Sequence, residues 1–106
     1  MESSVEQWRR GWRAKLRRVV HQGEPIWLLK EEINPQDEVI YLTVVSRWEG
    51  RWMRRRYTYD VVGDVLHFRG ELPISHDERA KLKPEHLLDL RPEGEEALRV
   101  SHPSPT

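Results

Sequence analysis

The sequence predicts an α+β fold in which one N-terminal helix packs on a four-stranded antiparallel β-meander. Three observations support it: a helical stripe near the N-terminus, four strand-forming runs separated by turn signals, and a polar C-terminal stretch. A length of 106 residues suggests one domain. We assign residues 1–90 to this domain, with a short C-terminal helix, and expect a disordered tail over 91–106. A half-open barrel made from the same strands is the structural alternative.

The first element is a helix with capping signals at its start. Ser3 and Ser4 are each followed three residues later by a Glu or Gln, which is the spacing of a capping box. Apolar residues then recur at helical spacing. This stripe consists of Val5, Trp8, Trp12, Leu16 and Val19. Gly11 weakens the helix or allows close packing there, and Gly23 and Pro25 end it.

Four runs rich in apolar, β-branched and aromatic residues follow, and turn signals bound them. The predicted strands are 26–30, 39–48, 51–60 and 65–69, and the turns are 34–37, 49–50 and 61–64. Glu49 and Gly50 fit a two-residue hairpin loop. Ser75 starts a second capping box, which opens a short helix over residues 76–82.

The last two turns independently place the same apolar residues on one side of the sheet, which the helix should cover. This helix-facing set is Ile40, Leu42, Val44, Met53, Tyr57, Tyr59, Leu66 and Phe68. We expect Leu42 and Phe68 to be buried there against tryptophans of the helix. Arg55 is the charged exception, and its long side chain is expected to reach solvent.

The opposite, outer face of the sheet mixes basic and aromatic side chains. Arginines can bind phosphates and aromatic rings can stack on bases, a combination that binds single-stranded nucleic acid. The candidate nucleic-acid-binding residues are Tyr41, Arg47, Trp52, Arg54, Arg56 and Arg69. The predicted register sets Arg56 directly opposite Arg69, a like-charge pair that a bridging anion would relieve. The competing interpretation is a solvated face whose arginines pair with acidic residues and whose aromatic rings pack in a dimer.

Composition excludes several classes of protein. Hydrophobic residues make up 37% of the chain and charged residues 34%, and the absence of cysteine excludes disulfide scaffolds, thiol catalysis and Cys-ligated metals. The chain lacks an apolar run of membrane-spanning length and a signal pattern, so we expect a cytoplasmic protein. The net charge is zero, but residues 1–57 carry 12 basic and 8 acidic side chains, and 58–106 carry 6 and 10. Abundant charge and a single Asn also fit a thermophilic source.

Two further features are candidate contact surfaces. Arg9, Arg13 and Arg17 follow one another at helical spacing and form a secondary basic ridge, which could also lie on a membrane surface. We interpret the tryptophan stripe beside it as core, and therefore expect no membrane partner. Trp48 and Trp52 flank the hairpin tip, where they could form an exposed contact pair or pack across the strands.

The sequence shows no catalytic constellation. The five histidines lack metal-ligand spacing, and neither a glycine-rich phosphate loop nor a nucleophile elbow is present. We therefore predict a non-catalytic binding module without a metal or cofactor. Nucleic acid bound on the outer face is the favoured hypothesis. The alternative is a protein–protein interaction module or homodimeric accessory subunit that buries the same face.

Overall fold

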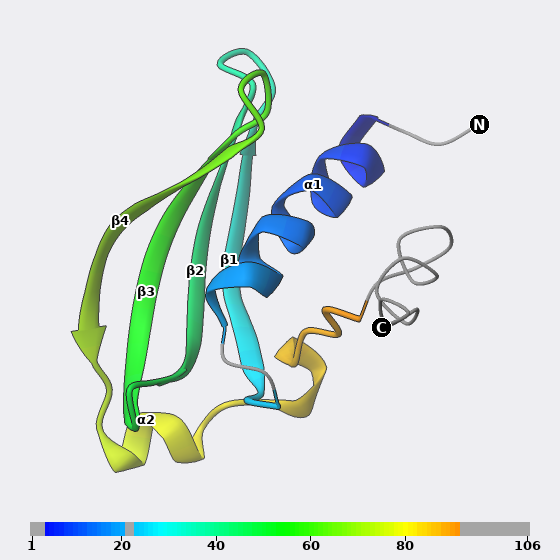
Figure 1. Cartoon of the computed structure of the whole chain (residues 1–106). Coiled ribbons are helices and arrows are strands. Elements are labelled where there is room, and N and C mark those ends of the chain that lie inside the picture. The colour runs from blue at the N-terminus through cyan, green and yellow to red at the C-terminus, as the bar shows by residue number, and fades with distance from the viewer. Residues whose placement is uncertain (1–3, 21–22, 92–106) are drawn as a thin grey trace, which may run out of the picture.

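The computed structural model describes residues 4–20 and 23–91, so the predicted tail lies outside the described residues apart from Arg91. The elements are α1 (Ser4–Val19), β1 (Ile26–Asn34), β2 (Val39–Trp48), β3 (Arg51–Asp60), β4 (Val65–Pro73), α2 (His76–Ala80) and the 3-10 turn η1 (Pro84–His86). The strands form one antiparallel sheet in the order β1-β2-β3-β4, and α1 crosses one of its faces (Figure 1). The predicted α+β fold is confirmed. Within the described ranges, no helix has the length and apolar character needed to cross a bilayer.

Helix α1 lies very close to the sheet. Trp12 and Leu16, from the predicted stripe, are fully buried, and Trp8 packs against the same core. A Cβ atom on Gly11 would lie 2.1 Å from the hydroxyl oxygen of Tyr59 on β3. This residue therefore has to be glycine for the helix to approach the sheet at this distance.

The β2–β3 hairpin has the predicted register along its whole length, closing with Trp48 opposite Arg51. Its loop residues Glu49 and Gly50 have φ angles of 53° and 76°, and positive values at both positions are typical of a type I′ turn. The face assignment of both strands follows from this register. The helix-facing residues of the two strands that are buried as predicted are Ile40, Leu42, Val44, Met53, Tyr57 and Tyr59.

Strand β4 keeps the predicted register only in its first half. Tyr57 pairs with Phe68 as predicted. Beyond this pair, Arg56 lies opposite Gly70, because a β-bulge makes Arg69 an extra residue in the strand. Gly70 has a φ of 148°, which suits glycine. The predicted cross-strand pairing of Arg56 with Arg69 is therefore wrong. This pairing no longer supports an anion bound between the two side chains.

Phe68 and Arg55 both depart from their predicted environments. Phe68 is 54% exposed, so its predicted burial against the helix is wrong; it lies on the edge strand, with its ring edge-on to Tyr57 at 5.8 Å. Arg55 does not extend into solvent. Its guanidinium donates hydrogen bonds to Tyr57 and Glu71, and it stacks 4.1 Å from the centre of the Trp48 ring.

Strand β1 is longer than predicted and continues to Asn34 instead of ending at residue 30. Glu31 interrupts the apolar pattern, although its pairing with Leu42 places it on the helix-facing side. Its carboxylate accepts hydrogen bonds from Arg9 at 2.8 Å and from the Trp12 indole at 3.1 Å, both on α1. The inward charge is thereby paired, as a partly buried carboxylate requires.

The C-terminal segment (residues 74–90) runs from β4 past the strand ends to the opposite edge of the sheet (Figure 1). Ser75 caps α2 as predicted, since its hydroxyl accepts a hydrogen bond from the Glu78 amide at 3.1 Å. The segment then reaches β1, where the Leu88 amide donates to the Ile26 carbonyl at 2.9 Å. The C-terminal segment therefore partly covers the β1 edge of the sheet.

Candidate functional site

The outer face has a covered end, near the β2–β3 hairpin, where α2 lies over it. Trp27 of β1 and Trp52 of β3 lean together across β2, with ring centres 5.6 Å apart. The guanidinium of Arg79 on α2 lies 5.0 Å from the centre of the Trp52 ring. Val45 pairs with Trp27 and is buried. These contacts form a small second core on the outer face.

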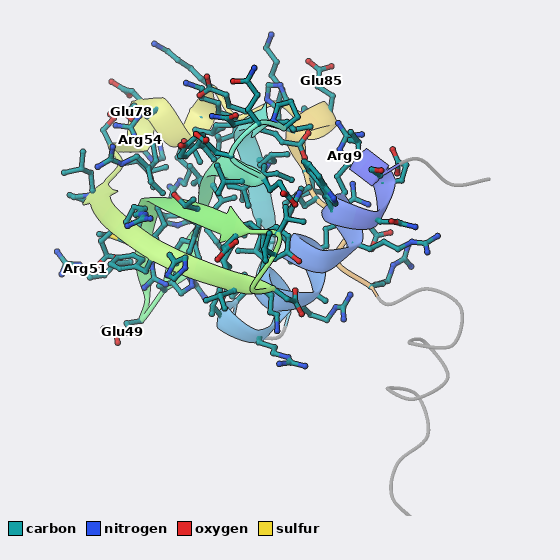
Figure 2. The ribbon with its side chains drawn as sticks, turned by 90° about the horizontal axis from the view of Figure 1, so that it is seen from above. Arg9, Glu49, Arg51, Arg54, Glu78 and Glu85 are labelled. Carbon is teal, nitrogen blue, oxygen red and sulfur yellow. The ribbon has the colours of Figure 1, made fainter. Side chains whose placement is uncertain are left out.

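Three predicted site residues belong to this covered end. Arg47 makes an ion pair with Glu24 at 2.8 Å, and Arg54 lies 3.9 Å from Glu78 of α2. Figure 2 shows Arg54 and Glu78 side by side. Trp52 is packed against its neighbours and is partly buried. Arg47, Trp52 and Arg54 thus have contacts within the chain, although Arg54 is the neighbour of Arg56 on the outer face of β3.

The other end of the outer face carries four exposed side chains, which we call the open patch: Tyr41, Arg56, His67 and Arg69. Tyr41 and His67 flank Thr58 in one cross-strand row, and Arg56 lies one outward-facing position further along β3. Arg69 donates through Nε to the Thr58 hydroxyl at 3.1 Å, which leaves its two terminal nitrogens for an anion. Arg56 has no carboxylate partner among the residues that the structure describes.

His67 is a member of the open patch that the candidate set omits. The strand alternation already places it on the outer face, and its position opposite Thr58 sets it beside Arg69. The patch therefore combines two guanidinium groups, a phenol and an imidazole, groups that bind anions and stack on flat rings. Over residues 4–20 and 23–91, no cluster of three His, Asp or Glu side chains could hold a metal ion.

The secondary basic ridge packs against the rest of the chain. Arg9 makes ion pairs with Glu31 at 2.8 Å and with Glu6 at 3.0 Å. Arg13 is partly buried. Arg17 donates a hydrogen bond through Nε to the backbone carbonyl of Leu90, at the end of the C-terminal segment. The ridge is thus used to hold α1 against β1 and the C-terminal segment.

The two tryptophans at the hairpin do not form an exposed pair. Trp48 is 5% exposed and lies on the helix-facing side, where its indole Nε1 donates to the Val19 carbonyl at 2.8 Å. Trp52 lies on the outer face in the second core. Their packing therefore stabilises the two sides of the sheet separately.

Comparisons with known proteins leave the chain without a family assignment. No protein-family model matches it, and neither the curated proteins nor the solved structures give a significant match. The function is therefore inferred from the chemistry of the open patch.

Proposed function

We propose that this chain is a small non-catalytic binding module whose open patch binds single-stranded nucleic acid. One observation carries the proposal: Arg56 is exposed without a carboxylate partner in the described residues, close to Arg69 and to Tyr41, which is 41% exposed. Guanidinium groups can bind phosphates with two parallel hydrogen bonds. A neighbouring aromatic ring can stack on a base whatever its sequence.

The patch is smaller than the six-residue surface predicted from the sequence. Arg47 and Arg54 already face the carboxylates of Glu24 and Glu78, so two arginines rather than four are available for phosphates. Each neutralised phosphate contributes a log–log salt slope of about −0.7 on single strands, so two contacts give a slope near −1.4. Binding should therefore be weak and moderately salt-dependent.

Arg56→Ala and Arg51→Ala form a matched pair for testing this proposal. Both residues are exposed arginines of β3, but Arg51 pairs with Trp48 and lies on the other side of the sheet, at the hairpin tip labelled in Figure 2. Binding of oligothymidylate and oligouridylate is measured by fluorescence anisotropy at several salt concentrations. We expect Arg56→Ala to flatten the slope by about 0.7 and Arg51→Ala to leave it unchanged. Equal losses in both variants, or no binding at low salt, would reject the open patch as the site.

Tyr41 tests the stacking contact in the same titration. Tyr41→Ala should weaken binding by about 1–3 kcal/mol without changing the salt slope, because it removes a stacked ring and no charge. Tyr41→Phe keeps the ring and should bind as the unmodified chain does. A loss in both variants would assign the hydroxyl, rather than the ring, to the contact.

The second candidate function is a protein–protein module that uses the same face. The ion pair between Arg47 and Glu24, and the approach of Glu78 to Arg54, show that carboxylates are suitable partners for arginines on this face. A partner's acidic side chains could occupy Arg56 and Arg69 in the same way. If Arg56→Ala with Arg69→Ala breaks an oligomer and leaves oligonucleotide binding unaffected, this alternative replaces the nucleic-acid proposal.

A further inference from the structure

Strand β4 forms a free sheet edge with an unusual number of exposed apolar side chains. It is the last strand in the sheet order, and none of the elements that the structure describes lies beside its outer edge in Figure 1. The most exposed large apolar residues in the described ranges lie on β4 or in the turn before it. They are Val62 (76%), Leu72 (60%), Phe68 (54%) and, at the start of the strand, Val65 (43%), with Leu87 (49%) lying elsewhere. Such an edge readily pairs with another strand.

The direction of the backbone groups identifies which residues of β4 face the free edge. The Ile74 amide donates to the Trp52 carbonyl, so Trp52 directs its backbone groups towards β4. The direction alternates along a strand, so Thr58 does the same and exchanges hydrogen bonds with His67, which lies opposite it. Leu66 and Phe68, on either side of His67, therefore point their N–H and C=O groups outwards.

These outward residues are complementary to a second copy of themselves. In an antiparallel pair, directly opposite residues lie on the same face, and Leu66 and Phe68 share the helix-facing side. Leu66 can therefore lie opposite Phe68 of a second copy, because both side chains are on the same face and both residues direct their backbone groups outwards. This arrangement creates two equivalent apolar pairs about a two-fold axis at His67.

Neighbouring registers are less favourable. Setting Phe68 opposite Phe68 would place Leu66 against Gly70 in the bulge, and setting Leu66 opposite Leu66 would place Phe68 against the charged Asp64. Sliding by a single residue would place side chains from different faces opposite each other, which an antiparallel pair does not allow.

We propose that the free edge of β4 pairs antiparallel with the same edge of a second copy of this chain, with His67 at the two-fold axis. The two four-stranded sheets then form one continuous sheet with an isologous interface. The bulge at Arg69 and Gly70 limits the regular hydrogen bonding to the first half of β4, so the apolar contacts supply much of the affinity.

Single-cysteine variants test the register directly, because the chain contains no cysteine. Opposite residues in a non-hydrogen-bonded pair have Cβ atoms about 4.5–5.5 Å apart, close enough for a disulfide after small shifts. Under mild oxidation, His67→Cys should therefore form a covalent dimer. Leu66→Cys and Phe68→Cys should form few homodimers alone but cross-link with each other when mixed. Equal cross-linking of all variants alone, or none in any, would overturn the proposal.

Charge substitutions test the apolar contact without cysteine chemistry. Phe68→Lys should weaken dimerisation at least about tenfold in sedimentation equilibrium, since two buried rings are lost from the interface. Leu29→Lys, which changes an exposed leucine at the other edge of the sheet, should dimerise normally. Circular dichroism verifies that both variants are folded. A monomeric unmodified chain, or equal weakening in both variants, contradicts this interface.

This interface and the proposed nucleic-acid function fail separately. A monomeric chain whose oligonucleotide binding depends on Arg56 would refute the β4 dimer and leave the open patch intact. A dimer that is weakened by Phe68→Lys but binds no oligonucleotide would support the β4 interface and refute nucleic-acid binding by the open patch.

Discussion

Gly11 shows how one residue sets the distance between the helix and the sheet. Helix propensity alone disfavours glycine in a helix interior by about 1 kcal/mol relative to alanine. The Tyr59 hydroxyl lies where a Cβ of residue 11 would have to be, at 2.1 Å, and the ring carbon bearing the hydroxyl lies at 2.8 Å. The two effects of a methyl group at this position therefore have opposite signs, and the overlap is the larger of them.

Gly11→Ala should therefore lower the free energy of unfolding by about 1–3 kcal/mol, the usual cost of overpacking, despite its better helix propensity. Urea unfolding monitored by circular dichroism measures the change. Tyr59→Phe removes the nearest atom, so the alanine should cost less in the Tyr59→Phe background, as a double-mutant cycle would show. A stabilised Gly11→Ala variant would mean that the helix lies further from β3.

Among elements, the junction of α1, β3 and the β3–β4 turn depends on Asp64. Tyr59 donates a hydrogen bond to its carboxylate at 2.6 Å, and Lys15 of α1 lies 3.3 Å away. The Tyr59 hydrogen bond, helped by Lys15, lowers the pKa of Asp64 below its ordinary value, while burial and the carboxylate raise the pKa of Tyr59. Asp64 is largely exposed, so its contribution to stability is modest.

This junction predicts a pH dependence with a defined sign. A carboxyl group whose folded-state pKa is lowered contributes stability above its unfolded pKa of about 3.9, and loses it as the pH falls through the folded value. Asp64→Asn should therefore be less stable than the unmodified chain at neutral pH, with the difference shrinking in acid. Asparagine suits the positive φ of 52° at this position. Urea unfolding over a pH series measures the difference.

Glu85→Gln is the matched control for this pH series. Glu85 is an exposed carboxylate of η1 with no ion pair in the described ranges. Its removal should change stability little at any pH. A constant difference for Asp64→Asn from neutral to acid pH would show that the charge of the carboxylate does not stabilise the fold.

The elements also show what local sequence patterns determine. The β2–β3 register was predictable because a two-residue loop and strand alternation fix it together. The bulge at Arg69 could not be predicted, because its only local signal is the following Gly70, and a glycine there fits the end of a strand equally well. The full length of β1 could not be predicted either, because Glu31 breaks the apolar alternation. Its partners on α1 are distant in sequence, so periodicity could not reveal them.

At the scale of the whole molecule, the C-terminal segment decides which part of the outer face is available. The residue types of that face were predictable from strand alternation. The division of this face into a covered end and the open patch was not predictable. It arises because α2, which is distant in sequence, brings Glu78 and Arg79 over Arg54 and Trp52. The basic first half and acidic second half of the sequence thus partly neutralise each other within one fold.

The C-terminal segment should also stabilise the domain, and two truncations separate its contribution from that of the predicted tail. Leu88 and Leu90 pack against the core, and the Leu88 amide bonds to Ile26. Removing residues 83–106 takes these contacts away, and a loss of even 1 kcal/mol lowers Tm by about 4–8 °C in a domain of this size. Removing only residues 92–106, which lack a periodic apolar pattern, should leave Tm nearly unchanged. Thermal unfolding followed by circular dichroism compares the two, and equal losses would mean that the last residues, rather than Leu88 and Leu90, stabilise the β1 edge.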